Sequence, residues 1–206
     1  MSKRNINKSF GVIQGGNYDD IKINGFCNIE DDIVCDTIIV SGCANFSGDI
    51  KCDDIRINGA VNIEGDVKAD TLEIRGTVNA NNIETEKFML YGAANINGDI
   101  NTDELDAKTI SIFRNIYGEK IIIKGTKFNH NIKVTINSDF KNVGNSSQLS
   151  QFNEIEATTI ELSYIKGNRI SGEKITIGDM VEIDTVEYTD SISINSNAKI
   201  NKIIKL

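Results

Sequence analysis

Few residues in this 206-residue chain have the side chains that enzymes use for proton transfer or nucleophilic attack. The one histidine, His130, lies in a polar stretch rich in Asn, Ser and Gln. A serine or cysteine nucleophile needs a positioned base beside it, and a lone histidine in a polar stretch is weak support for such a pair. We therefore interpret His130 as a surface residue and expect no catalytic residues and no enzymatic activity.

The four cysteines follow the spacing of a repeat and not that of a metal site. Their intervals are 8, 8 and 9 residues, at Cys27, Cys35, Cys43 and Cys52. Zinc sites typically contain a C-x-x-C pair, and nucleotide sites a G-x-x-x-x-G-K-[ST] loop; this sequence has neither. We expect no metal and no cofactor, and we expect reduced thiols.

Two columns of aspartates suggest a calcium site, because carboxylate oxygens are the preferred ligands of Ca²⁺. One column is Asp32, Asp49, Asp66 and Asp99, and the other is Asp36, Asp53, Asp70 and Asp103. Calcium-binding solenoids repeat G-G-x-G-x-D every nine residues, and that pattern is missing. We interpret the aspartates as solvated turn residues. A similar column of amides should point outward and hydrogen-bond along a stack, at Asn28, Asn45, Asn62, Asn79 and Asn95.

These columns belong to a repeat of about 17 residues. The repeats are spaced by 17, 17, 17, 16 and 17 residues and start at Ile21, Ile38, Ile55, Leu72, Phe88 and Leu105. Each contains three apolar-x-apolar segments separated by turn residues, and alternation with period two predicts strands with one buried face. Three short strands per repeat fit one coil of a triangular β-solenoid, in which coils stack at about 4.8 Å. We expect a glycine column at one corner, at Gly25, Gly42, Gly59, Gly76 and Gly92.

The predicted fold is all-β: a single-stranded right-handed β-helix with triangular coils of about 17 residues. Left-handed solenoids usually repeat a hexapeptide pattern, which intervals of 6, 6 and 5 residues fit less well. We expect a flexible N-terminal tail over residues 1–17, a regular solenoid over 18–125, a surface insertion over 126–153 that is partly ordered at Ile132–Ile136, and a continuation of the solenoid over 154–206. Nine to ten coils would give a rod roughly 45 Å long.

Composition and charge narrow the function classes further. The chain has 36 Ile and 25 Asn and no Pro or Trp, a composition that favours strands and tight turns. Its longest apolar runs are too short to span a bilayer, and no apolar segment follows the charged N-terminus as in a signal peptide, so we expect a cytoplasmic protein. A net charge of −8 disfavours nucleic-acid binding, which needs basic surface.

The N-terminal 17 residues are basic, unlike the acidic body of the chain. They contain three cations and no acid, and each cation near an anionic membrane surface contributes about 1 kcal/mol. A solvated tail is the more ordinary interpretation. The alternative is a weak contact with the inner face of the cell membrane, and its candidate residues are Lys3, Arg4, Lys8, Phe10, Val12 and Ile13.

The central repeats resemble a known protein family. Residues 59–76 are GAVNIEGDVKADTLEIRG, and residues 92–100 repeat the pattern as GAANINGDI. Over about residues 18–107 this pattern resembles the bactofilins, bacterial polymer-forming cytoskeletal proteins. The resemblance implies a right-handed β-helix with flexible tails that assembles end to end into non-polar filaments without nucleotide. Some family members reach the membrane through a short apolar N-terminal stretch.

The last coil favours self-assembly independently of this resemblance. Solenoids usually protect their end coils with a polar cap or a helix, whereas residues 198–206 are AKINKIIKL and no helix is predicted after them. Uncovered strand edges can pair with another chain. We expect a self-assembly end made of Ile200, Ile203 and Leu206, with a second copy or a paralogue as the partner.

Two other function classes stay open. One is a β-solenoid enzyme, either an acyltransferase, which would need a hexapeptide repeat and a histidine, or a polysaccharide-cleaving type, which would need surface aromatics and an export signal. The other is a binding scaffold that does not polymerise, such as a surface-display or ice-binding solenoid, which would need a flat array of Thr or aromatic residues. The residues that each class needs are missing or scarce here, so we prefer a structural polymer.

Overall fold

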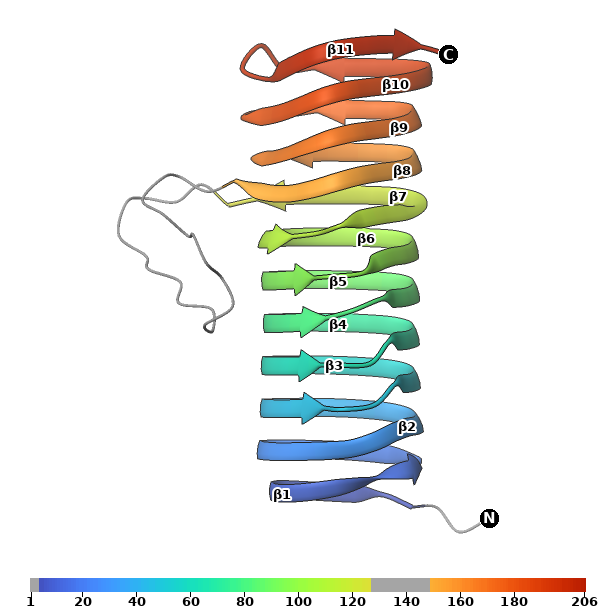
Figure 1. Cartoon of the computed structure of the whole chain (residues 1–206), viewed down its shortest axis with the longest axis vertical. Coiled ribbons are helices and arrows are strands. Elements are labelled where there is room, and N and C mark those ends of the chain that lie inside the picture. The colour runs from blue at the N-terminus through green and yellow to red at the C-terminus, as the bar shows by residue number, and fades with distance from the viewer. Residues whose placement is uncertain (1–3, 127–148) are drawn as a thin grey trace, which may run out of the picture.

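The computed structural model describes residues 4–126 and 149–206. The described residues form eleven strands, each paired in parallel with the next one in the chain, and β6 also touches β8. Figure 1 shows the strands as successive turns of one rod, with β1 and β11 at opposite ends. The strands are β1 (Ile6–Asn17), β2 (Asp20–Phe46), β3 (Ile50–Ile63), β4 (Val67–Ala80), β5 (Ile83–Ile96), β6 (Asp99–Ile112), β7 (Asn115–Gly125), β8 (Ser150–Ser163), β9 (Ile165–Ile177), β10 (Val181–Ile194) and β11 (Lys199–Lys205).

The predicted β-solenoid is confirmed, with about 10 turns and a spacing of about 17 residues. Each long strand bends around the corners of a coil, so successive strands are successive turns. The predicted repeat starts stack in register, since Ile38 pairs with Ile55, Ile55 with Leu72, and Leu72 with Phe88. The described segments include no helix that could cross a bilayer.

The core is a set of apolar columns that run along the axis of the rod. The longest of these apolar columns has one member in each of ten successive turns. Its residues are Ile33, Ile50, Val67, Ile83, Ile100, Ile116, Ile155, Ile170, Val186 and Ile203. All but the last are buried. A single coil cannot bury these side chains, so the stack provides the core that each turn lacks.

The glycine column occupies a corner where successive turns are unusually close. Gly59 has a φ of +150°, and a Cβ built on it would lie 1.8 Å from the carbonyl oxygen of Gly42. A side chain cannot fit at that distance, and the backbone conformation is one that L-residues rarely adopt. The predicted role of the glycine column is therefore confirmed.

The solenoid continues beyond the predicted insertion. Ile121 of β7 pairs with Ile160 of β8, which pairs with Ile175 of β9. The insertion was expected over residues 126–153, but Ser150 and the three residues after it belong to β8. Residues 127–148, which include His130 and the expected ordered stretch Ile132–Ile136, lie outside the described residues.

The structure corrects the prediction of a flexible tail over residues 1–17. Residues Ile6–Asn17 form strand β1, which pairs with β2 as the first turn of the solenoid. Ile13 is only 2% exposed and lies in register with Ile29. The period is hidden in the sequence because Lys8 takes the position that pairs with the buried Ile23, and because the register shifts after Lys8.

We predict that shortening one core side chain destabilises the rod by much more than removing a stacked amide. Ile57 is 2% exposed, so Ile57→Ala should lower the free energy of unfolding by about 2–5 kcal/mol. Asn62, half-buried on the outer surface of the same turn, is the control, and Asn62→Ala should cost about 1 kcal/mol. Urea unfolding of the two variants measures both values, and equal losses would contradict the assigned register.

Candidate functional site: the ends of the solenoid

Among the described residues, the core columns end at β11 in partly exposed side chains. Ile203 is the last member of the ten-residue column, and it is 49% exposed although Val186 beneath it is buried. Leu206 is 66% exposed, and Ile200 is half-buried over Ile183. The structure thus brings together the three residues predicted as the self-assembly end.

The backbone at this end is equally open to a partner. Within the described residues β11 is the last strand of the sheet and pairs with β10 alone. Its pairing covers Glu182–Tyr188, so the last side of β10, from Ser191 onward, has no strand above it. Ile194 lies there and is exposed. The predicted self-assembly end did not include Ile194, although this residue follows the same alternation as the buried Ile177 with which it pairs.

Lysines surround this apolar end, and two of them are held by the turn below. Lys199 Nζ lies 2.8 Å from Glu182 Oε1, and Lys205 Nζ lies 5.9 Å from the centre of the Tyr188 ring. The hydrogen bond from Lys199 lowers the pKa of Glu182, and the same bond raises the pKa of Lys199. The pair therefore fastens β11 to β10, and Lys202 and Lys205 add positive charge at the end of the rod.

The N-terminal end is more covered than the C-terminal end. Lys8 lies above the buried column that contains Ile23, and its ammonium group donates a hydrogen bond to the carbonyl oxygen of Val12. Arg4 stacks on the ring of Tyr18 at 4.5 Å, and its backbone N–H donates to Asp19 at 2.6 Å. Because the stem of a lysine is apolar and its head is charged, Lys8 partly closes this end of the core.

The predicted membrane-contact residues do not form one group. Phe10 is 75% exposed and Val12 is also exposed, so both face outward from β1. Ile13 belongs to the core and is not available to a membrane, because its side chain is buried inside the first turn. Lys3 lies outside the described residues.

The aspartate column at one corner has a structural role that the sequence interpretation did not include. Asp32 accepts a hydrogen bond of 2.9 Å from the backbone N–H of Asp49, and Asp49 accepts one of 2.8 Å from that of Asp66. Each carboxylate thus satisfies a donor in the next turn. No group of three His, Cys, Asp or Glu side chains in the described part of the chain could hold a metal ion.

The predicted amide ladder forms only in part. Asn45 donates a hydrogen bond of 3.0 Å to Asn28 in the preceding turn, whereas Asn95 donates one of 3.1 Å to Asn97 in its own turn. In consequence the side-chain oxygen of Asn79 is buried without a hydrogen-bond partner among the described residues. The ladder therefore adds less to stability than a continuous one would.

Cys35 and Cys52 are stacked neighbours, as predicted. Both are buried free thiols, and their Sγ atoms are 3.3 Å apart. The hydrogen bond with Cys35, together with burial, raises the pKa of Cys52 above that of an ordinary thiol. A protonated, buried thiol is a poor nucleophile, so this pair serves packing.

A buried cluster of hydroxyl groups lies where the insertion leaves the rod, and sequence reasoning missed it. Ser111 Oγ accepts from the backbone N–H of Ala94 at 2.9 Å, and Ser150 Oγ accepts from that of Ser111 at 3.1 Å and donates to the carbonyl oxygen of Thr109 at 3.0 Å. The hydroxyls replace ladder bonds at the point where one side of a coil is interrupted. The sequence does contain a signal for this cluster, because these hydroxyl residues occupy positions at which the other repeats have apolar residues.

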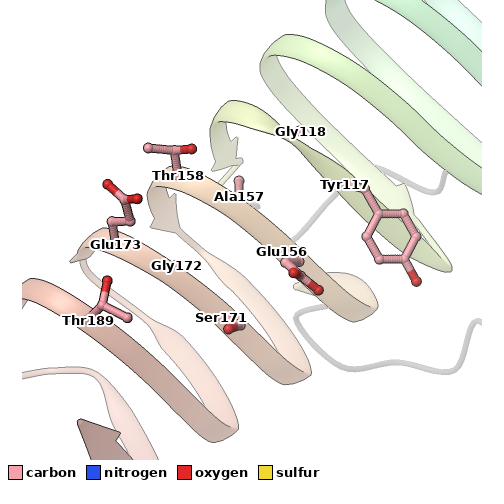
Figure 2. A pocket seen from close by; sticks show the side chains of 9 residues that line it. All are labelled: Tyr117, Gly118, Glu156, Ala157, Thr158, Ser171, Gly172, Glu173 and Thr189. Carbon is pink, nitrogen blue, oxygen red and sulfur yellow. The ribbon is translucent and has the colours of Figure 1, made fainter. Parts of the chain in front are cut away.

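One corner of the C-terminal half is hollowed into an open groove of about 470 Å³. Figure 2 shows Tyr117 and Glu156 on one side of it and Thr158 and Glu173 on the other, with Gly172 between. Burial and nearby carboxylates raise the pKa of Tyr117, so its hydroxyl stays protonated at neutral pH. The lining combines two carboxylates with hydroxyl groups and small residues.

The geometry thus defines a class of protein, a β-solenoid rod with an uncovered apolar end that is suited to self-association. A family model described as polymer-forming cytoskeletal, the bactofilin family, matches residues 10–115. The chain belongs to this family. Neither a curated protein nor a solved structure matches the chain significantly.

We predict that the attachment of β11 depends on pH through the Glu182–Lys199 pair. The pKa of Glu182 is lowered, so its contribution is complete above the ordinary pKa of glutamate and is lost as the pH falls through the lowered value. The raised pKa of Lys199 predicts a second loss as the pH rises through that value. Hydrogen-exchange protection of the β11 amides should therefore be greatest near neutral pH.

Substitution of the acid separates this pair from other titrating groups. Glu182→Gln should lower the protection of β11 at neutral pH and flatten its acid dependence. Glu161, which pairs with Lys124 at 3.1 Å in the middle of the rod, provides the control, because Glu161→Gln should leave β11 unchanged. An unaltered acid profile in Glu182→Gln would show that another group controls β11.

Proposed function

We propose that this bactofilin is a structural subunit that assembles end to end through the ends of its solenoid, without nucleotide and without enzymatic activity. The observation that carries the proposal is Ile203, a member of an otherwise buried column that is half exposed at the last turn. Family membership supports a polymer-forming cytoskeletal protein. We place the polymer in the cytoplasm, with a second copy or a paralogue as the next subunit.

Docking of a second end on β11 would continue the interactions that build the rod. The free edge of β11 would gain a parallel or antiparallel neighbour, and Ile200, Ile203 and Leu206 would lose contact with water. Complete burial of one such aliphatic side chain contributes about 1.5–3 kcal/mol. Three of them on each copy are therefore enough for a specific contact, before the cost of association.

The symmetry of the contact determines whether dimers or filaments form. Joining two C-terminal ends is isologous and gives a dimer, and filaments require the N-terminal end to bind as well. Both ends are basic, with Arg4 and Lys8 at one and Lys199, Lys202 and Lys205 at the other. Every combination of ends therefore brings like charges together, and salt should weaken this repulsion.

We predict that assembly strengthens with ionic strength, needs no nucleotide and is blocked by Ile203→Lys. The substitution puts a charge at the centre of the apolar end, where burial would be costly. Static light scattering across a salt series, at several protein concentrations, measures the assembly. Ile122→Lys is the matched control, since Ile122 faces outward in the middle of the rod between Asp106 and Glu161.

Two outcomes would contradict this proposal. A wild-type protein that remains monomeric at every salt and protein concentration would leave a solitary rod. Equal scattering by Ile203→Lys and wild type would show that assembly uses another surface. Negative-stain images of the same samples distinguish dimers from filaments.

We also propose a weak membrane contact through the exposed side chains of β1. Phe10→Asn combined with Val12→Asn should reduce pelleting with anionic liposomes, because apolar side chains that could enter the interface are removed. Both residues face outward, so the fold should persist. The tail-deleted chain is unsuitable here because β1 is part of the rod. Equal pelleting of variant and wild type would exclude β1 from membrane binding.

A further inference from the structure

Two of the four cysteines occupy the same inward column of the solenoid, in adjacent turns. Cys35 of β2 pairs in register with Cys52 of β3, and both thiols are buried and free. Cys27 is buried in a different column, where it pairs with Gly11, and Cys43 is exposed. The backbone therefore brings one particular pair of thiols together.

Side chains in this column point along the rod toward the next turn. The Sγ atoms of Cys35 and Cys52 are 3.3 Å apart. Further along the same column, which continues through Ala69, the Oγ1 atom of Thr85 donates to that of Thr102 at 3.0 Å. The position thus directs each γ-atom at the γ-atom of its neighbour, which is the orientation that a disulfide needs.

Parallel pairing also sets a distance that a disulfide spans with slight strain. Neighbouring strands are about 4.8 Å apart, which lies within the range of about 4.4–6.8 Å between the Cα atoms of a disulfide. The usual separation of the two Cβ atoms is shorter, about 3.8 Å, so closing the bond draws the two turns together locally. Strained disulfides are reduced more easily than relaxed ones. A bond at this position is therefore reversible and not permanent.

The two thiols are covered less completely than Cys27. Cys35 and Cys52 keep 5% and 4% of their surface exposed, whereas Cys27 keeps none. The residues that follow them in the chain, Asp36 and Asp53, are exposed. Hydrogen peroxide is not much larger than water, so it can reach a site that excludes a bulky reagent. The hydrogen bond with Cys35 and burial raise the pKa of Cys52, so little thiolate is present and the reaction is slow.

We propose that Cys35 and Cys52 form a reversible redox site, at which peroxide joins the second and third turns of the rod by a disulfide. One thiolate attacks a peroxide oxygen, the O–O bond breaks, and the cysteine becomes a sulfenic acid with release of water. The other thiol attacks the sulfenic sulfur, so the S–S bond forms and the S–O bond breaks with release of a second water. Two small thiols of the glutathione class restore the pair by exchange and leave as their own disulfide.

The bond holds together the turns next to the N-terminal end. Within the described residues β1 pairs with β2 alone, and each turn of a solenoid is held only by its neighbours. Unfolding that starts at this end therefore reaches Cys35 before it reaches the middle of the rod. A disulfide between residues 17 positions apart limits the freedom of the unfolded chain, and here it also keeps β2 on β3. Oxidation thus protects the N-terminal turns, and reduction releases them.

The test uses the full-length chain with Cys43→Ser, which removes the exposed thiol and with it any cross-link between rods. After treatment with hydrogen peroxide and removal of the excess, we expect a mass lower by two hydrogens and a peptide in which Cys35 is joined to Cys52. The unfolding temperature should rise by about 5–10 °C, and reduced glutathione should reverse all three changes. Adding Cys52→Ala should abolish them, whereas adding Cys27→Ser, the matched control at a buried thiol, should leave them intact.

Oxidation of the unfolded chain shows whether the fold selects this pair. In urea the shorter loop between Cys27 and Cys35 closes more readily, so a bond between Cys35 and Cys52 should be a minor product there. A folded protein that gives the same mixture of bonds as the unfolded chain overturns the proposal. So does a folded protein in which the two thiols stay reduced or become sulfinic acids without joining. A joined pair with an unchanged unfolding temperature overturns the protection of the N-terminal turns.

Discussion

Backbone pairing between successive turns is the interaction on which the whole structure depends. A turn of about 17 residues cannot bury its own apolar side chains, and it has no hydrogen-bond partners for its strands until a second turn lies on it. Parallel pairing in register converts each position of the repeat into a column along the rod. Each position of the repeat therefore has the same requirement in neighbouring turns. At Gly59 a Cβ would not fit, and at Ile57 the side chain must be apolar because it is buried.

The same rule places like charges beside one another, and the structure relieves this in two ways. At one corner Asp32 and Asp49 turn their carboxylates to backbone donors of the next turn, so the repulsion is offset by charge-assisted hydrogen bonds. Elsewhere the charge alternates between turns. Arg169, for example, contacts Glu154 below and, at 2.7 Å, Glu187 above. Ion pairs at a protein surface contribute little each, but these pairs remove a cost that the stacking would otherwise impose.

The sequence predicts the columns well and the interruptions poorly. Ile55, Leu72 and Phe88 follow the period and are buried as expected, and Ile200, Ile203 and Leu206 lie together at the end. The first turn was missed because Lys8 stands at a core position, where a lysine at the end of a column can reach a carbonyl oxygen and water. The hydroxyls of Ser111 and Ser150 were missed for a related reason, since their role depends on a strand that is interrupted there. The repeat period alone predicts the columns of the rod but not how its ends and interruptions are built.

The ends and the sides of the rod differ in what they expose. The ends expose apolar side chains and basic groups, whereas the sides are mainly acidic. In the turn of β11 the apolar column is partly exposed at Ile203, and an exposed apolar strand end can be covered by another chain. The sides have no such need, and acidic groups there keep separate rods apart. In the proposed end-to-end assembly, a rod with basic, apolar ends and acidic sides would grow along its axis.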